Sequence, residues 1–158
     1  MLVKGVIDED FVNYKEPAMY IATTKCNFKC CTEAGINICQ NMSIIKQPDI
    51  NIDNNKLIER YLNNPITKAI VFSGLEPFET FDEMYDFIKK LRWDYSCFDP
   101  VVIYTGFYPY EIIDKLSCLS KFDKIIIKFG RFLPDQEPHF DEVLGVDLAS
   151  SNQWAEEL

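Results

Sequence analysis

The sequence lacks both basic runs and long apolar runs. No stretch approaches the ~20 apolar residues that a membrane-spanning helix needs, and the opening MLVKGVIDED turns acidic before a signal-peptide core develops. The formal net charge is −9 and the pI is near 4.6. Because nucleic-acid surfaces need clustered Lys and Arg to meet phosphates, this charge argues against nucleic-acid binding. We therefore expect a cytoplasmic protein that binds neither nucleic acid nor membrane.

Internal repeats, low-complexity tracts and Gly/Ser-rich linkers are also missing. A chain of 158 residues fits one domain, residues 1–158, and is long enough to bury a core without disulfide bonds. Histidine is nearly absent, since His139 is the only one and is remote in sequence from the cysteines. In a reducing cytoplasm, clustered cysteines more often serve metal or redox chemistry than disulfide formation.

Four of the six cysteines crowd into CNFKCCTEAGINIC, and these are Cys26, Cys30, Cys31 and Cys39. Three interpretations compete: a disulfide bond, a zinc site and an iron–sulfur cluster. Zinc accepts four thiolates, but two adjacent cysteines rarely point both sulfurs at one small ion, which ranks zinc second. Three cysteines can instead hold a four-iron cluster and leave one iron open to an outside ligand. The isolated Cys97 and Cys118 fit the role of small buried hydrophobes.

Apolar segments with β-branched residues alternate with helical patterns along the chain. The segments predict strands over residues 18–24, 67–74, 100–106 and 123–129. The helical patterns cover residues 53–64 behind a cap at Asp53 or Asn54, residues 80–91 behind a Thr80–Glu83 capping box, and a helix starting at Pro109. This alternation predicts an α/β fold of parallel strands with right-handed crossovers.

Ligand sites in such folds lie at the carboxyl ends of the strands. The segments that follow the four predicted strands are the cysteine stretch, SGLEPF, YTGFYP and FGRFLP. We therefore expect the thiols, the Gly-Leu-Glu-Pro turn and the Tyr-Thr-Gly turn to form one site.

Several segments carry a resemblance to a known family. CNFKC resembles the first half of the CxxxCxxC motif of radical S-adenosylmethionine (SAM) enzymes, and FSGLEPF resembles their Ser-Gly-Gly-Glu-Pro turn. One branch, the anaerobic ribonucleoside-triphosphate reductase activating proteins, is similar over further segments in the same order: DFVNYKEPAMYIAT, VVIYTGF, IIIKFGRFLPD and LASSNQ. The chain departs from the family in an expanded Cys-x3-Cys-x8-Cys loop and in Leu75, which replaces a glycine, and so resembles a divergent member.

The resemblance implies a compact partial (β/α) barrel of parallel strands, of radical SAM type. It implies a [4Fe-4S] cluster held by Cys26, Cys30 and Cys39, with Cys31 as an alternative ligand, and SAM bound at the open iron. The electron that cleaves SAM would come from a donor such as flavodoxin or ferredoxin. The resulting radical would remove hydrogen from a glycine of a large glycyl radical enzyme, the anaerobic (class III) ribonucleotide reductase. No catalytic side chain beyond the cluster and SAM is implied.

The resemblance also assigns SAM contacts residue by residue: Ile38 and Gln40 beside the last ligand, Ser73, Gly74, Leu75 and Glu76 on the methionine side, Tyr104 and Gly106 in the same cavity, and Ser150, Ser151 and Asn152 near the adenosine. Glu76 equally fits a helix-entry carboxylate. Lys128 and Arg131 fit two roles, carboxylate binding and solvated charge, and the second ranks first. Two other functions stay open: a small radical SAM protein acting on another substrate, and a non-catalytic iron–sulfur or zinc protein.

Overall fold

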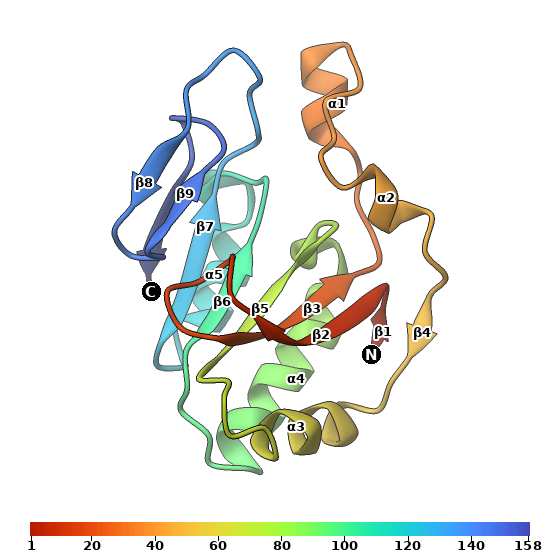
Figure 1. Cartoon of the computed structure of the whole chain (residues 1–158), viewed down its shortest axis with the longest axis vertical. Coiled ribbons are helices and arrows are strands. Elements are labelled where there is room, and N and C mark those ends of the chain that lie inside the picture. Colours follow the sequence, from red (N-terminus) through yellow and green to blue (C-terminus); the bar gives the residue numbers. More distant parts are fainter.

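The computed structural model describes residues 1–158 and is built on a six-stranded sheet (Figure 1). In spatial order the strands are β10 (Trp154–Glu157), β7 (Ile125–Phe129), β6 (Val101–Tyr104), β5 (Ala69–Gly74), β3 (Ala18–Thr23) and β2 (Gly5–Asp10). The four central strands are parallel, while β2 and β10 are antiparallel to their single neighbours. The sheet is therefore open at both edges.

Three helices carry the crossovers between the parallel strands: α3 (Asn54–Leu62), α4 (Phe81–Trp93) and α5 (Ile113–Leu119). Short 3₁₀ turns, η1 (Pro77–Thr80) and η2 (Pro109–Glu111), precede the last two. The remaining elements are the pair β1 (Leu2–Val3) and β4 (Ile50–Asn51), the hairpin β8 (His139–Asp141) and β9 (Val146–Leu148), and the short helices α1 (Lys29–Ala34) and α2 (Met42–Ile45). No helix combines the length and apolarity needed to cross a bilayer.

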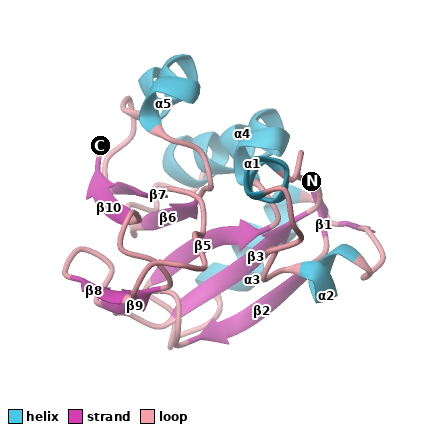
Figure 2. Cartoon of the chain, turned by 90° about the horizontal axis from the view of Figure 1, so that it is seen from above, coloured by secondary structure: helices cyan, strands magenta, loops and turns pink.

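Both faces of the sheet are buried, which explains the continuous apolar runs of its central strands. Alternate residues of the strands point to opposite sides, so that Phe72 packs edge-to-face on Phe87 of α4, with ring centroids 5.3 Å apart. On the other face, Val71 and Val102 pack with Leu144, which lies between β8 and β9. Figure 2 shows α4 and α5 on one side of the sheet and the β8–β9 hairpin on the other.

The predicted parallel strands and the alternating α/β order are present in the structure. The cap at Asp53 is confirmed, because its carboxylate accepts hydrogen bonds from two backbone N–H groups of α3. The Thr80–Glu83 capping box is wrong. Thr80 Oγ1 donates to the Pro77 carbonyl, and the Glu83 carboxylate accepts instead from the backbone N–H of Leu2, at 2.6 Å. The assignment of this open sheet to the radical SAM barrel type stays a prediction.

Candidate functional site

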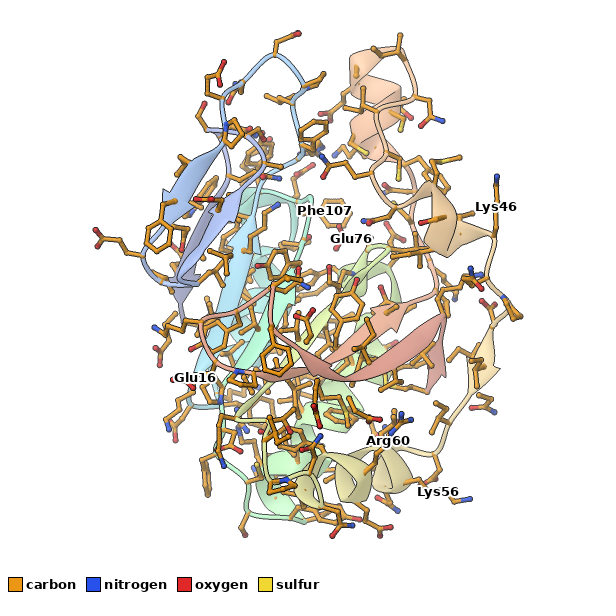
Figure 3. All side chains as sticks on the ribbon, in the orientation of Figure 1. Glu16, Lys46, Lys56, Arg60, Glu76 and Phe107 are labelled. Carbon is orange, nitrogen blue, oxygen red and sulfur yellow. The ribbon has the colours of Figure 1, made fainter.

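The segments that follow β3, β5, β6 and β7 meet at the carboxyl ends of these strands and line one cavity of about 310 Å³. This volume lies within the ~300–1,000 Å³ typical of ligand pockets. Figure 1 shows the α1–α2 segment and the β8–β9 hairpin on opposite sides of the strand ends. Figure 3 shows Glu76 at these strand ends. Most of the residues predicted for the site line the cavity: Cys26, Cys30, Ile38, Cys39, Gln40, Ser73, Gly74, Leu75, Glu76, Tyr104 and Gly106.

The four clustered cysteines divide into three and one. Cys26, Cys30 and Cys39 are half-buried and line the cavity. Cys31 lines a separate hollow formed by the cysteine segment itself, and its Sγ lies 3.6 Å from Asn37 Oδ1. The sulfurs of Cys30 and Cys31 are 4.0 Å apart. Of this adjacent pair, Cys30 lines the cavity and Cys31 does not.

Local backbone geometry explains this division. Residues 29–34 form the helix α1 rather than the loop expected from the sequence, so adjacent residues point about 100° apart around the helix axis. Phe28 enters the helix with φ 55° and Gly35 ends it with φ 68°, two reversals in the left-handed region. Cys39 follows these reversals, and its N–H donates to Asn37 Oδ1 at 3.3 Å. Cys26 and Cys39 thereby face the same cavity from either end of the segment.

The sequence suggests two metal groups for these thiols, a zinc ion and an iron–sulfur cluster. No group of three or more His, Cys, Asp or Glu side chains lies at the distances that one metal ion requires. A four-iron cluster binds each thiolate through a different iron, so its ligands stand farther apart than those of a single tetrahedral ion. Cys26, Cys30 and Cys39 all line one cavity, as three thiolate ligands of one such cluster would. Burial raises the pKa of Cys26, and burial with the neighbouring Cys31 raises the pKa of Cys30 to about 11, so iron binding must displace protons.

Glu76 connects the end of β5 to the loop after β6. Its carboxylate accepts hydrogen bonds from Thr105 Oγ1 at 2.7 Å, from the N–H of Gly106 at 2.9 Å and from the N–H of Phe78 at 3.2 Å. The last bond confirms the helix-entry interpretation, since Phe78 belongs to η1. Burial raises the pKa of Glu76 to about 7, although the hydrogen bonds and Lys128 act in the opposite direction. The sequence pattern did not reveal the partner Thr105.

The prediction that Lys128 and Arg131 are solvated charges is wrong. Both are buried, with 7% and 4% of the residue exposed, and both line the cavity. The alternative of carboxylate binding holds for Arg131, which contacts Glu33 and Glu111. Lys128 Nζ donates to the Gly130 carbonyl at 2.9 Å and lies over the ring of Tyr104. Burial lowers the pKa of Lys128 to about 8. The signal that could have revealed Lys128 is its position inside IIIKF, a strand buried on both faces.

Three residues assigned to the adenosine side lie outside the cavity lining. Ser150 is buried, and the hydroxyl of Ser151 donates to Gln136 Oε1 at 2.7 Å. Asn152 Nδ2 donates to the Arg131 carbonyl at 2.9 Å, which fixes the segment that carries the arginine. The neighbouring Gln153 lines the cavity instead. A contact between adenosine and Ser151 or Asn152 stays a prediction.

The turn after β5 approaches β3 closely at Gly74. Its φ of +86° lies in the region that favours glycine, and a Cβ there would stand 2.9 Å from Ala22 Cα. Leu75 follows with its side chain partly exposed, and it lines the cavity beside Cys26. The turn thus brings backbone and one apolar side chain to the cysteine side of the cavity.

An open α/β sheet with three thiols around a cavity at its strand ends indicates an iron–sulfur protein. Residues 18–153 match the family model described as "4Fe-4S single cluster domain". The match covers most of the chain, and the chain belongs to this family of iron–sulfur proteins. No curated protein and no solved structure matches. Membership supports the predicted [4Fe-4S] cofactor and favours iron–sulfur over zinc.

Proposed function

We propose that the protein is a radical SAM activating enzyme, which reductively cleaves SAM at a [4Fe-4S] cluster and generates a glycyl radical on a partner enzyme. The observation that carries the proposal is the division of the thiols. Cys26, Cys30 and Cys39 line the cavity that the Ser-Gly-Leu-Glu turn also lines, and Cys31 lines a separate hollow. Three thiolates leave one iron of a four-iron cluster free for a ligand from the cavity.

The chain's own residues would bind and orient the cofactors. Cys26, Cys30 and Cys39 would hold the cluster, with Ile38 and Gln40 on either side of the last thiolate. Ser73 and Gly74 would offer backbone groups to the methionine part of SAM. The reduced cluster, when bound, supplies the electron that breaks the sulfur–C5′ bond of SAM.

Two tyrosines form part of the cavity wall. Tyr20 and Tyr104 line the cavity, and the Tyr104 hydroxyl donates to the Asn13 carbonyl at 2.6 Å, which fixes its ring. Glu76 has its acceptors engaged by three donors from the protein and is not free to act as a general base. Removal of hydrogen by a carbon radical needs no such base. Positioning is the task that remains for the protein.

The substrate in this proposal is a large glycyl radical enzyme, the anaerobic ribonucleotide reductase, with flavodoxin or ferredoxin as electron donor. Support comes from the mouth of the cavity, where Val12 lines the wall and is 71% exposed, next to Phe11 at 62%. Adjacent exposed apolar side chains at a site opening are typical of a surface that a protein partner covers.

The test is anaerobic reconstitution with iron and sulfide, reduction in the presence of SAM, and quantification of 5′-deoxyadenosine. Wild type and Cys31→Ala should both form the product, because Cys31 lies outside the cavity. Cys26→Ala and Cys39→Ala should not. Cys31→Ala is the matched control, since it removes one thiol of the same segment. A wild-type cluster that is reduced but never cleaves SAM would refute the proposal.

A second candidate is a non-catalytic iron–sulfur protein that transfers electrons. Leu75 favours it, because its side chain lines the cavity beside Cys26 at the position where the resembling family has glycine. Calorimetric titration of the reconstituted protein with SAM separates the two functions. Binding by Leu75→Gly but not by wild type would support the second candidate. Binding by wild type without glycyl radical formation on the reductase would point instead to a radical SAM protein with another substrate.

A further inference from the structure

Helix α1 carries Cys30 yet has no hydrophobic anchor. None of its residues is buried, and no side chain caps its first turn. Short helices gain most of their stability from packing of an apolar face, and this one has none. The direction in which Cys30 points must therefore be fixed by other contacts.

Those contacts are ionic and come from two other segments. Lys29 Nζ donates to the carboxylate of Glu111 in η2. Arg131, which follows β7, places Nη2 2.5 Å from Glu111 Oε1 and Nε 3.1 Å from Glu33 Oε2. Lys29 and Glu33 are four residues apart on α1 and share one face of it, with Cys30 next to Lys29. We call Lys29, Glu33, Glu111 and Arg131 the ion cluster.

The half of the ion cluster on the body of the protein is buried, with side-chain exposures of 9% for Glu111 and 4% for Arg131. Burial would raise the pKa of Glu111, but hydrogen bonds from Arg131, Lys29 and the N–H of Tyr108 outweigh it and lower the pKa to about 2. Exposed ion pairs contribute little to stability, whereas a buried charge that loses its partner is costly. Glu111 and Arg131 thus form a fixed charged surface on which α1 docks.

We propose that Glu111 is a positioning residue that, together with Arg131, holds α1 so that Cys30 faces the cavity and binds iron. The inference rests on Cys30 being a cluster ligand, as in the proposed function, but not on SAM cleavage. Because Lys29 and Glu33 are 42% and 52% exposed, added salt weakens their half of the ion cluster. Retention of the iron–sulfur cluster should therefore depend on salt.

The test compares Glu111→Gln with wild type after reconstitution. Glutamine keeps the size of the side chain and an acceptor for the N–H of Tyr108, but removes the charge. Glu79→Gln is the matched control, since Glu79 also binds the cysteine segment, through Asn27 Nδ2 at 2.7 Å, and is outside the ion cluster. Two readouts are taken: the rate at which the visible absorbance of the cluster decays with a chelator, and the electron paramagnetic resonance spectrum of the reduced cluster.

We expect Glu111→Gln to lose its cluster about tenfold faster and to show an altered spectrum, while Glu79→Gln behaves as wild type. Salt should accelerate the loss more in wild type than in Glu111→Gln, which keeps only the Arg131–Glu33 pair of the ion cluster. Lys29→Met changes an exposed residue and should reproduce the effect without disturbing the core. In the double variant the two effects should not add, because they break the same interaction.

Decay rates, spectra and salt response equal to wild type in Glu111→Gln would overturn the positioning role, and so would additive effects in the double variant. Cys30→Ala distinguishes this failure from failure of the proposed function. If Cys30→Ala retains the wild-type cluster, the proposed ligand set and the inference both fall. If Cys30→Ala loses the cluster but Glu111→Gln keeps it as wild type does, the inference alone is wrong.

Discussion

The buried carboxylate of Glu76 should make the cluster-free protein less stable as the pH rises from about 5 to 7. Burial raises its pKa in the folded protein to about 7, compared with 4.5 for an ordinary glutamate. Between these values the folded state holds a proton that the unfolded state has released. Folding is therefore favoured at the lower pH, and the contribution is lost as the pH rises through the folded pKa.

The size of the effect follows from the difference of about 2.5 pKa units between 7 and 4.5. At ~1.4 kcal/mol per unit the whole shift corresponds to about 3 kcal/mol, of which about 2 kcal/mol should be lost from the free energy of unfolding between pH 5 and 7. The positive charge of Lys128 acts on Glu76 and already opposes the rise in its pKa. Glu76→Gln has no proton to release. The stability of this variant relative to wild type should therefore increase with pH by the same amount.

The assay is urea unfolding of the cluster-free protein, with reductant and without oxygen, at several pH values from 5 to 7.5. Glu79→Gln is the control, because its carboxylate is exposed. Curves for Glu76→Gln that run parallel to wild type at every pH would refute the reasoning. They would mean that the carboxylate ionises in the folded state as readily as in water.

Two further substitutions test the packing around the site. Gly74→Ala should destabilise the protein by about 2 kcal/mol, because φ is +86° and the new Cβ would stand 2.9 Å from Ala22 Cα; an unchanged thermal midpoint would contradict the close approach of β5 to β3. Arg92→Met should cost about 3 kcal/mol, because buried Arg92 donates to three backbone carbonyls that would lose their donor. A midpoint of urea unfolding for Arg92→Met close to that of wild type would show that these carbonyls find other donors.

The parallel strands and their convergence could be predicted because burial on both faces leaves a continuous apolar run in the sequence. IVF within β5 and VVI within β6 are such runs, and the residues after them line the cavity as expected. The edge strands could not be predicted in the same way. β2 reads GVIDED and β10 reads WAEE, and their acidic residues do not give the pattern of a buried strand.

Interactions between distant segments also could not be predicted from the sequence pattern. From the sequence alone, Arg131 was predicted to be a surface charge, but in the structure it lies beside Glu111 of η2. No local spacing in the sequence links Lys29 to Glu111. That Cys30 lines the cavity while Cys31 does not depends on the helix α1, whereas the crowded cysteines had indicated a loop. Capping at Asp53 was predictable because it depends on residues within one helical turn.

The parallel pairing of β3 with β5 also has a consequence for the order of events during synthesis. Ala18 lies opposite Ala69, and the whole cysteine segment is enclosed in the crossover between them. Sheets assembled from such distant parts of a chain fold slowly, on a scale of about milliseconds to seconds. All six cysteines are free thiols, and the pocket that shelters three of them exists only once the strands are in register. Until the sheet is complete, these thiols are exposed to oxygen, and an iron–sulfur cluster has no formed pocket to occupy.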